Sequence, residues 1–286
     1  MKDLNKVGVV GAGMMGAEIA LCFARSGYAV VLKDATLDLA QSGKNRLGSV
    51  LDRQIKKGSI TAEDKDSILS RIEPTDQYSV FSDIDLVVEA VFESLEVKKE
   101  VFAQLDKICA PGCIFATNTS SMSITLLATS VTPARIGNFV GTHFFSPASV
   151  MKLVEVIPGL ETKEETVDYA MECCRKIEKV PIRVKDVTGF VLNRILHIMW
   201  IEAMRLLEEG VASPEDIDLA CKFGLGHPVG PFALMDLTSN NLNLQVQDIL
   251  FEAYGERFKP RPILKQKVDA GHLGRKTGRG WHTYEK

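Results

Sequence analysis

A glycine-rich turn between two apolar segments near the start of the chain is the feature that most limits its fold. Residues 6–10 (Lys-Val-Gly-Val-Val) are typical of a buried strand, and residues 11–16 have the pattern G-x-G-x-x-G. Apolar residues then recur at helical spacing until Gly27, after which residues 28–33 predict a second strand. The sequence therefore predicts a strand–helix–strand unit whose two strands are parallel and lie in one sheet.

The residues of this turn have separate physical roles in binding a dinucleotide. Gly11 permits a tight turn, Gly13 lets the backbone approach a pyrophosphate, and Gly16 lets the helix pack closely on the strand. The helix begins with Met14 and Met15, and the free N–H groups of a helix N-terminus attract phosphate oxygens. We expect all five residues to lie against the cofactor.

Asp34, eighteen positions after Gly16, follows the second predicted strand. Its carboxylate is placed to accept hydrogen bonds from ribose hydroxyls and would repel a 2′-phosphate, so the motif favours NAD over NADP. Lys33 is a neighbouring cation that could soften this preference. The alternative interpretation is a purely structural glycine turn beside a solvated aspartate.

Predicted strands and helices alternate along the first two thirds of the chain. Further strands are expected at residues 84–89, 114–117, 139–145 and 153–157, with helices at 36–57, 61–71 and 98–108. Beyond residue 185 the pattern is helical, with helices expected at 188–209, from 213 onward and at 234–254. We predict a Rossmann-type α/β dinucleotide-binding domain over residues 1–185, with a parallel sheet covered on both faces, and an all-α domain over residues 186–286.

Composition and charge exclude several classes of function. The 286 residues carry a formal net charge of −3, so nucleic acid is not expected as the main partner. No apolar run is long enough to span a membrane, and the N-terminus lacks the features of a secretory signal. The six cysteines are scattered without paired C-x-x-C knuckles, so we expect free thiols, no metal site and a cytoplasmic protein.

His143 and Glu155 are the first candidates for acid–base chemistry. His143 lies at the end of a predicted strand, where parallel sheets place their ligands, and the pKa of histidine suits a general base near neutral pH. Glu155 interrupts an apolar run, and a buried carboxylate needs a partner such as a histidine. Taken by itself, a lone histidine is still more often structural than catalytic.

Five motifs resemble those of one enzyme family, in the same order and over nearly the whole chain. They are Asn-Thr-Ser-Ser at 118–121, His-Phe-Phe-Ser-Pro at 143–147, Val-Met-Lys-Leu-Val-Glu-Val-Ile at 150–157, Gly-Phe-Val-Leu-Asn-Arg at 189–194 and Gly-Arg-Lys-Thr-Gly-Arg-Gly-Trp at 274–281. The chain resembles 3-hydroxyacyl-CoA dehydrogenases, and in layout the short bacterial 3-hydroxybutyryl-CoA dehydrogenases. The resemblance implies NAD-dependent interconversion of (S)-3-hydroxyacyl-CoA and 3-oxoacyl-CoA by a homodimer built through the helical domain.

The resemblance also implies a role for each matching residue. His143 corresponds to the general base, which takes the hydroxyl proton as hydride leaves for the nicotinamide, and Glu155 corresponds to the acid that orients its ring. Ser120 and Asn193 correspond to groups that hold the substrate oxygen. The plainer alternatives are a turn for Ser120 and a helix-start hydrogen bond for Asn193.

Further residues correspond to contacts with the cofactor and with the thioester. Glu93, Lys98 and Ser146 resemble cofactor contacts, together with Ser120. The alternative for Glu93 and Lys98 is a solvated helix start with an ordinary spaced ion pair. For the CoA phosphates, the basic helix after the second strand offers Lys57 as the best candidate, although such a charged face is more often simply solvated.

Three departures from the family pattern concern contacts rather than the reaction class. Ser146 stands where the family usually has Asn, and residues 186–190 are Asp-Val-Thr-Gly-Phe in place of Asp-Arg-Pro-Gly-Phe. Ala233 replaces a residue that is more often an acid, and residues 238–241 are Thr-Ser-Asn-Asn where the family more often has Gly-Leu-Asp. These changes leave room for an acyl chain bulkier or more polar than acetoacetyl.

Two other functions fit parts of the pattern. A related NAD-dependent dehydrogenase could act on a hydroxy acid without CoA, and a catalytically silent NAD-binding protein would need the dinucleotide site alone. Retention of Ser120, His143, Glu155 and Asn193 together argues against the silent protein, because binding requires no base.

Overall fold

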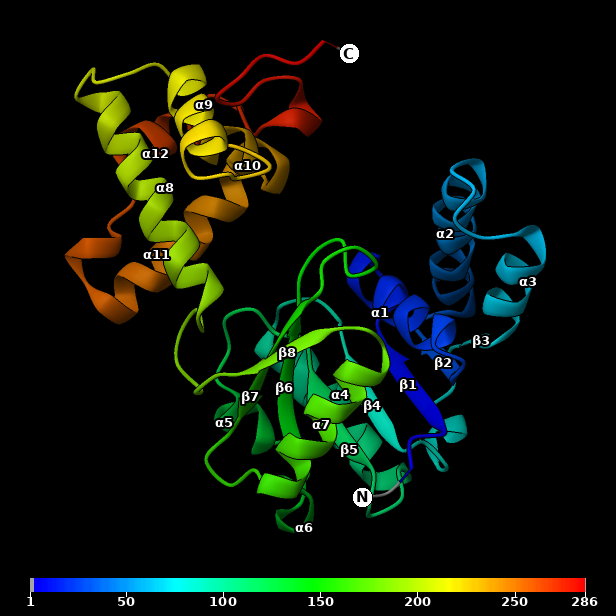
Figure 1. Ribbon diagram of the computed structural model, residues 1–286. Coiled ribbons are helices and arrows are strands. Elements are labelled where there is room, and N and C mark those ends of the chain that lie inside the picture. The colour runs from blue at the N-terminus through cyan, green and yellow to red at the C-terminus, as the bar shows by residue number, and fades with distance from the viewer. Residues whose placement is uncertain (1–2, 286) are drawn as a thin grey trace. The chain divides into compact units, whose positions relative to one another are not determined.

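The computed structural model describes residues 3–285 and divides the chain into two compact units. The first ends at Val187 and the second begins at Thr188, two residues beyond the predicted boundary. The first is built on a sheet and the second from helices (Figure 1). The predicted fold class, an α/β dinucleotide-binding domain followed by a helical domain, is confirmed.

Eight strands form one sheet in the order β3-β2-β1-β4-β5-β6-β7-β8. They are β1 (Lys6–Val10), β2 (Ala29–Lys33), β3 (Ile72–Thr75), β4 (Leu86–Glu89), β5 (Ile114–Thr117), β6 (Phe139–Phe144), β7 (Leu153–Pro158) and β8 (Val180–Arg183). The sequence analysis missed β3 and β8. Both are four-residue edge strands that contain a proline, Pro74 or Pro181, which an edge tolerates and which removes the usual strand signal.

One pair of strands contradicts the prediction of a parallel sheet. β6 and β7 are antiparallel, whereas the other paired strands run parallel. Only residues 145–152 connect them, which is too short for the helical crossover that a parallel pair requires. The reversal places His143 directly opposite Glu155 in the strand register.

Helices cover both faces of this sheet (Figure 1). They are α1 (Met14–Arg25), α2 (Leu37–Lys56), α3 (Ala62–Ser70), α4 (Leu95–Ile108), α5 (Ile124–Ala128), α6 (Pro133–Ile136) and α7 (Glu164–Lys176). The helices α1 and α7 share one hydrophobic core with Ala116 of β5. Phe102 of α4 packs against Phe115 and Phe139, whose ring lies 4.6 Å away. Because Phe115 and Ala116 are successive strand residues, these helices cover opposite faces.

The second unit packs five helices around a core that includes Trp200, Met204 and Phe232. The helices are α8 (Leu192–Glu208), α9 (Pro214–Gly224), α10 (Pro231–Thr238), α11 (Asn240–Tyr254) and α12 (Pro262–Asp269). The helix predicted over 234–254 is two helices, because Ser239 has a φ of 88° that no α-helix accommodates.

The C-terminal segment, residues 281–284, is held in place by hydrogen bonds to the buried Asp236. Asp236 accepts hydrogen bonds from the backbone N–H groups of Trp281 and His282, each at 2.9 Å, and from the hydroxyl of Tyr284 at 3.0 Å. The glycine- and arginine-rich stretch before Trp281 is therefore a packed tail. Among residues 3–285, no helix is both long and apolar enough to cross a membrane.

His197 of α8 makes the stability of the protein sensitive to mild acid. The side chain is buried against Trp200, its Nδ1 has no hydrogen-bond partner within residues 3–285, and burial lowers the pKa of the imidazole to about 4. The unfolded chain, with an ordinary pKa of 6.5, binds a proton between these values that the native state does not, so stability falls as pH falls through this window.

We expect this histidine to remove about 2 kcal/mol of unfolding free energy between pH 7 and pH 5. Denaturant titrations of the wild type and of His197→Phe at both pH values measure it. The variant should lose less stability on acidification. Equal losses in the two proteins would contradict the account.

Candidate active site

The glycine-rich turn leaves room for a phosphate only at its tip. Gly11 has a φ of 100°, and a Cβ there would lie 2.5 Å from the carbonyl oxygen of Ala90. A Cβ on Gly16 would lie 1.8 Å from the carbonyl oxygen of Gly11. Around Gly13, by contrast, no heavy atom of the described chain beyond its neighbours comes within 4 Å of a Cβ position. The first and last glycines serve packing, and the middle one keeps the surface open.

The start of α1 has the chemistry of an anion site. The helix begins at Met14, directly after Gly13, and its first turn, Met-Met-Gly, contains no acidic residue. The first backbone N–H groups of a helix have no partner within the helix, and the helix dipole adds positive potential. These residues fit the pyrophosphate of NAD.

Asp34 lies beside this turn at the end of β2 and also helps to build it. One carboxylate oxygen accepts the N–H of Ala12 and the other the N–H of Ala35, each at 2.7 Å. Each oxygen keeps a lone pair for a ribose hydroxyl. The Lys33 ammonium lies 4.0 Å from the ring centroid of Tyr78, and burial lowers its pKa. Its cation is thus engaged by the ring, which supports the preference for NAD.

His143 and Glu155 form a buried pair across the antiparallel strands. The Nδ1 of His143 lies 2.8 Å from Oε2 of Glu155, and the side chains are 6% and 0% exposed, respectively. The other ring nitrogen, Nε2, lies 3.2 Å from the hydroxyl oxygen of Ser120. The three side chains form one hydrogen-bonded chain, carboxylate to imidazole to hydroxyl, and the roles that the family resemblance implies for them stay predictions.

A second network, which runs from the buried Glu89 and Lys98 to the exposed Glu93, holds the loop that carries Ser120. Oε1 of Glu93 accepts the Ser120 backbone N–H at 2.9 Å and also the hydroxyl of Thr119. The Lys98 ammonium binds Oε2 of Glu93 at 3.2 Å and Oε1 of Glu89 at 2.8 Å. Burial raises the pKa of Glu93, but the charge of Lys98 and the hydrogen bonds from Thr119 and Ser120 outweigh it, so its pKa is lowered.

Glu89 is a site residue that the sequence analysis did not single out. Its carboxylate is completely buried, and it also accepts the hydroxyl of Thr117 at 2.6 Å and the N–H of Val91 at 2.7 Å. The available signal was an acid at the carboxyl end of an apolar strand, where parallel sheets place their ligands. Glu89 and Glu93 thus share the ammonium of Lys98.

The remaining predicted residues occupy different parts of the chain. The hydroxyl of Ser146 lies 3.9 Å from the sulfur of Met14, so the structure brings Ser146 to the start of α1. Lys57 is exposed directly after α2, and its binding of CoA stays a prediction. Asn193 is half-buried in the first turn of α8, and its contact with the substrate stays a prediction too. Within residues 3–285, no group of His, Cys, Asp or Glu side chains is arranged to hold a metal ion.

Comparisons with known proteins agree across both units. Two family profiles match: "3-hydroxyacyl-CoA dehydrogenase, NAD binding domain" over residues 6–187 and "3-hydroxyacyl-CoA dehydrogenase, C-terminal domain" over residues 189–284. A 3-hydroxybutyryl-CoA dehydrogenase of Clostridioides difficile is 41% identical over 98% of this chain and 100% of its own length. A 3-hydroxyadipyl-CoA dehydrogenase of Escherichia coli is 40% identical over 98% of this chain and 59% of its own.

A solved structure shows the same fold from end to end. The crystal structure of (S)-3-hydroxybutyryl-CoA dehydrogenase PaaH1 from Ralstonia eutropha covers 99% of this chain, and this chain covers 100% of it. The TM-score is 0.94 at 42% sequence identity.

Replacing His143 by Gln should separate chemistry from cofactor binding. The amide keeps a polar side chain of similar size but cannot accept a proton near neutral pH, so we expect kcat to fall at least about 100-fold. NADH affinity, measured by fluorescence titration, should be retained because the dinucleotide turn is untouched. His227→Gln is the matched control and should keep wild-type turnover. Loss of both turnover and NADH binding in a folded His143→Gln protein would count against His143 as the base.

Proposed function

This chain belongs to the 3-hydroxyacyl-CoA dehydrogenase family, and we propose that the line of Glu155, His143 and Ser120 performs its NAD-dependent reaction. The observation that carries the proposal is the buried pair of His143 and Glu155 at 2.8 Å. A completely buried carboxylate needs compensation, and the histidine supplies it on one side while keeping its other nitrogen toward Ser120.

The proton movements follow from this geometry. Glu155 accepts the Nδ1–H of neutral His143, which leaves the Nε2 lone pair available as a base. In oxidation, Nε2 takes the proton from the C3 hydroxyl of the substrate while C3 loses a hydride, and Glu155 stabilises the imidazolium that forms. In reduction, His143 returns the proton. Bound NAD supplies the hydride acceptor, held by the glycine-rich turn and Asp34.

Two hydrogen-bond donors are proposed to hold the reacting oxygen. Ser120 is positioned by Glu93, so its hydroxyl stays beside Nε2 of His143 and can donate to the C3 oxygen. The amide of Asn193, on the helical unit, is proposed as the second donor, as the family motif implies. The family resemblance implies the (S)-alcohol as the reduced substrate, and this configuration is part of the proposal.

We propose a short-chain thioester, such as 3-hydroxybutyryl-CoA, as the substrate. Two relatives, one named as a 3-hydroxybutyryl-CoA dehydrogenase and the other as a probable one, are each 41% identical to this chain over 98% of its length, which supports the assignment. Lys57 is proposed to bind CoA phosphates, and Ser146 the cofactor. The relative named for 3-hydroxyadipyl-CoA is as similar, so the acyl chain is the part of the proposal that most needs a test. The cytoplasmic location expected from the sequence stays a prediction.

Oxidation of NADH by the purified protein tests this function. We expect rapid turnover with acetoacetyl-CoA and NADH, at least about tenfold slower turnover with NADPH because Asp34 repels the 2′-phosphate, and none with free acetoacetate. Equal turnover of the free acid would instead support a dehydrogenase that does not need CoA. Absence of turnover while NADH still binds would support a silent binding protein.

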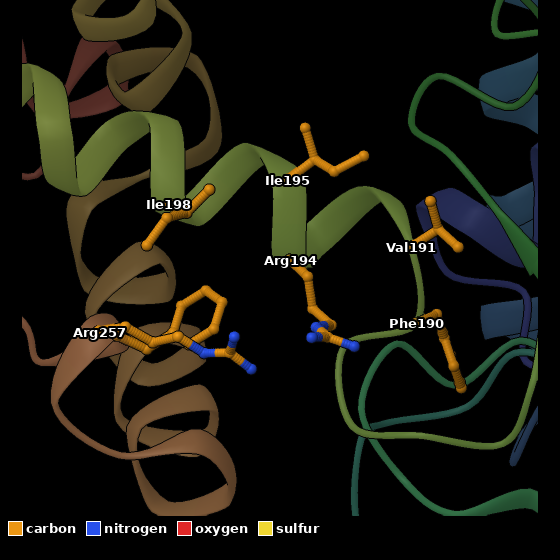
Figure 2. Close-up of a pocket in the computed structure, with 7 residues that line it drawn as sticks. Phe190, Val191, Arg194, Ile195, Ile198 and Arg257 are labelled. Atoms are coloured by element: carbon orange, nitrogen blue, oxygen red, sulfur yellow. The ribbon is translucent and has the colours of Figure 1, made fainter.

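We also propose that the chain forms a homodimer through one face of α8. Val191, Ile195 and Ile198 leave 40%, 59% and 38% of their surface exposed and line a pocket of about 340 Å³ (Figure 2). Arg194 and Arg257 also line it. Exposed apolar side chains repeated on one helix face are typical of a protein interface.

Charge indicates a second copy of the chain as the occupant of this face. Arg194 and Glu202 lie four residues before and after Ile198, so all three share one side of α8. If two copies of α8 cross antiparallel at Ile198, each Arg194 meets the partner's Glu202. The surface is therefore complementary to itself, as a two-fold interface requires.

A charge exchange tests the dimer. Arg194→Glu and Glu202→Arg should each shift the protein toward monomer at micromolar concentration, because each places like charges together across the interface. The double variant should restore the dimer. Light scattering coupled to gel filtration gives the mass directly. A monomeric wild type, or single variants that dimerise like it, would contradict the proposal.

A further inference from the structure

One face of α1 contacts the loop that follows β6, the strand that contains His143. Met14, Glu18 and Cys22 are spaced by four residues, so they lie on one side of the helix. Each of them contacts the loop 146–151. The helix whose start fits the pyrophosphate therefore also holds the segment that leaves the catalytic strand.

The central contact is made by Glu18. Its Oε2 accepts the backbone N–H of Ser149 at 3.0 Å and the hydroxyl of Ser149 at 3.2 Å. One oxygen thus fixes both the main chain and the side chain of a loop residue. Glu18 is only part-buried, so its carboxylate is compatible with solvent on its free side.

A buried lysine, Lys179, also holds the loop. The ammonium of Lys179 donates to the carbonyl oxygens of Ala148 at 2.6 Å and Met151 at 3.0 Å. The thiol of Cys22 donates to the Ala148 oxygen as well, at 3.4 Å. Burial of the lysine makes these hydrogen bonds stronger than they would be in water.

The loop begins with the residue that the structure brings to the cofactor end of α1. Ser146 is three residues beyond His143 and contacts Met14, the first residue of the helix. Five hydrogen bonds hold residues 148, 149 and 151 in place. Because Ser146 is only two residues before Ala148, these hydrogen bonds also restrict the position of Ser146. If the loop is already ordered before the cofactor binds, less of the binding free energy is lost in ordering it, so the cofactor binds more tightly.

We propose that Glu18 is a positioning residue for the cofactor, acting through Ser149 to keep Ser146 at the start of α1. In this proposal Glu18 acts through Ser149, so its removal should weaken NADH binding and leave the binding of the thioester unchanged. The proposal rests on the NAD binding of the proposed function. It does not depend on which acyl chain the protein accepts, because NADH binding can be measured without a thioester.

Fluorescence titration with NADH alone, without any thioester, tests the proposal on three variants. Glu18→Ala removes both hydrogen bonds and should weaken NADH binding about tenfold. Ser149→Ala removes only the hydroxyl contact and should weaken it about threefold. Glu18→Gln keeps an oxygen that accepts both donors, so it should bind NADH like the wild type.

Hydrogen exchange and kinetics separate positioning from general damage. Glu18→Ala should speed amide exchange in peptides covering 146–151 and leave peptides of the helical unit unchanged. Its KM for NADH should rise while its KM for acetoacetyl-CoA stays constant. If Glu18→Ala does not fold, Ser149→Ala carries the same test. Wild-type NADH affinity in Glu18→Ala or Ser149→Ala, or equal weakening in Glu18→Gln and Glu18→Ala, would overturn the proposal.

Discussion

The ionic hydrogen bond between His143 and Glu155 is the interaction on which the site depends. A carboxylate with no exposed surface is strongly unfavourable unless a partner compensates it. The partner is available because β7 runs against β6, so the register sets the two residues opposite each other on one face. A parallel β7 would need a long crossover and would not place them in this way. The local reversal of an otherwise parallel sheet is thus what pairs the two residues.

The other site groups are gathered by the parallel part of the same sheet. The glycine-rich turn, Glu89 and the loop of Ser120 follow β1, β4 and β5, whose carboxyl ends meet at one edge. Lys98 between Glu89 and Glu93 lets two acids share this edge, because its cation offsets both of them. Glu93 in turn holds the backbone N–H of Ser120, whose hydroxyl lies beside Nε2 of His143.

Sequence reasoning predicted the parts of the site that local patterns specify. The dinucleotide turn was predictable because its glycines and Asp34 have fixed spacing around a strand. His143 and Glu155 were each ambiguous alone, and only the family motifs joined them, since their pairing depends on an antiparallel register that the prediction of a parallel sheet missed. Glu89 was not predicted as a site residue because its partners, Val91, Lys98 and Thr117, come from three separate segments that the sequence pattern does not bring together.

The helical unit shows the same limit. The break at Ser239 depends on a positive φ, which is typical of glycine and not of serine. The two helices around it were therefore predicted as one. The start of α8 was placed too early, because Gly189 and Phe190 adopt left-handed conformations that delay the helix to Leu192. In contrast, the helix start at Ser213 was confirmed, since the serine caps the N–H of Asp216 in the pattern that its sequence indicates.

In the proposed reaction, His143 and Ser120 contact the reacting oxygen while Glu155 holds the imidazole ring through Nδ1. A crystal structure of the protein with NAD⁺ and acetoacetyl-CoA tests this most directly. We expect the C3 oxygen to lie within hydrogen-bonding distance of Nε2 of His143 and of the hydroxyl of Ser120, with Nδ1 still bound to Glu155. A C3 oxygen held by other groups, while His143 stays bound to Glu155 and Ser120, would contradict the proposed mechanism.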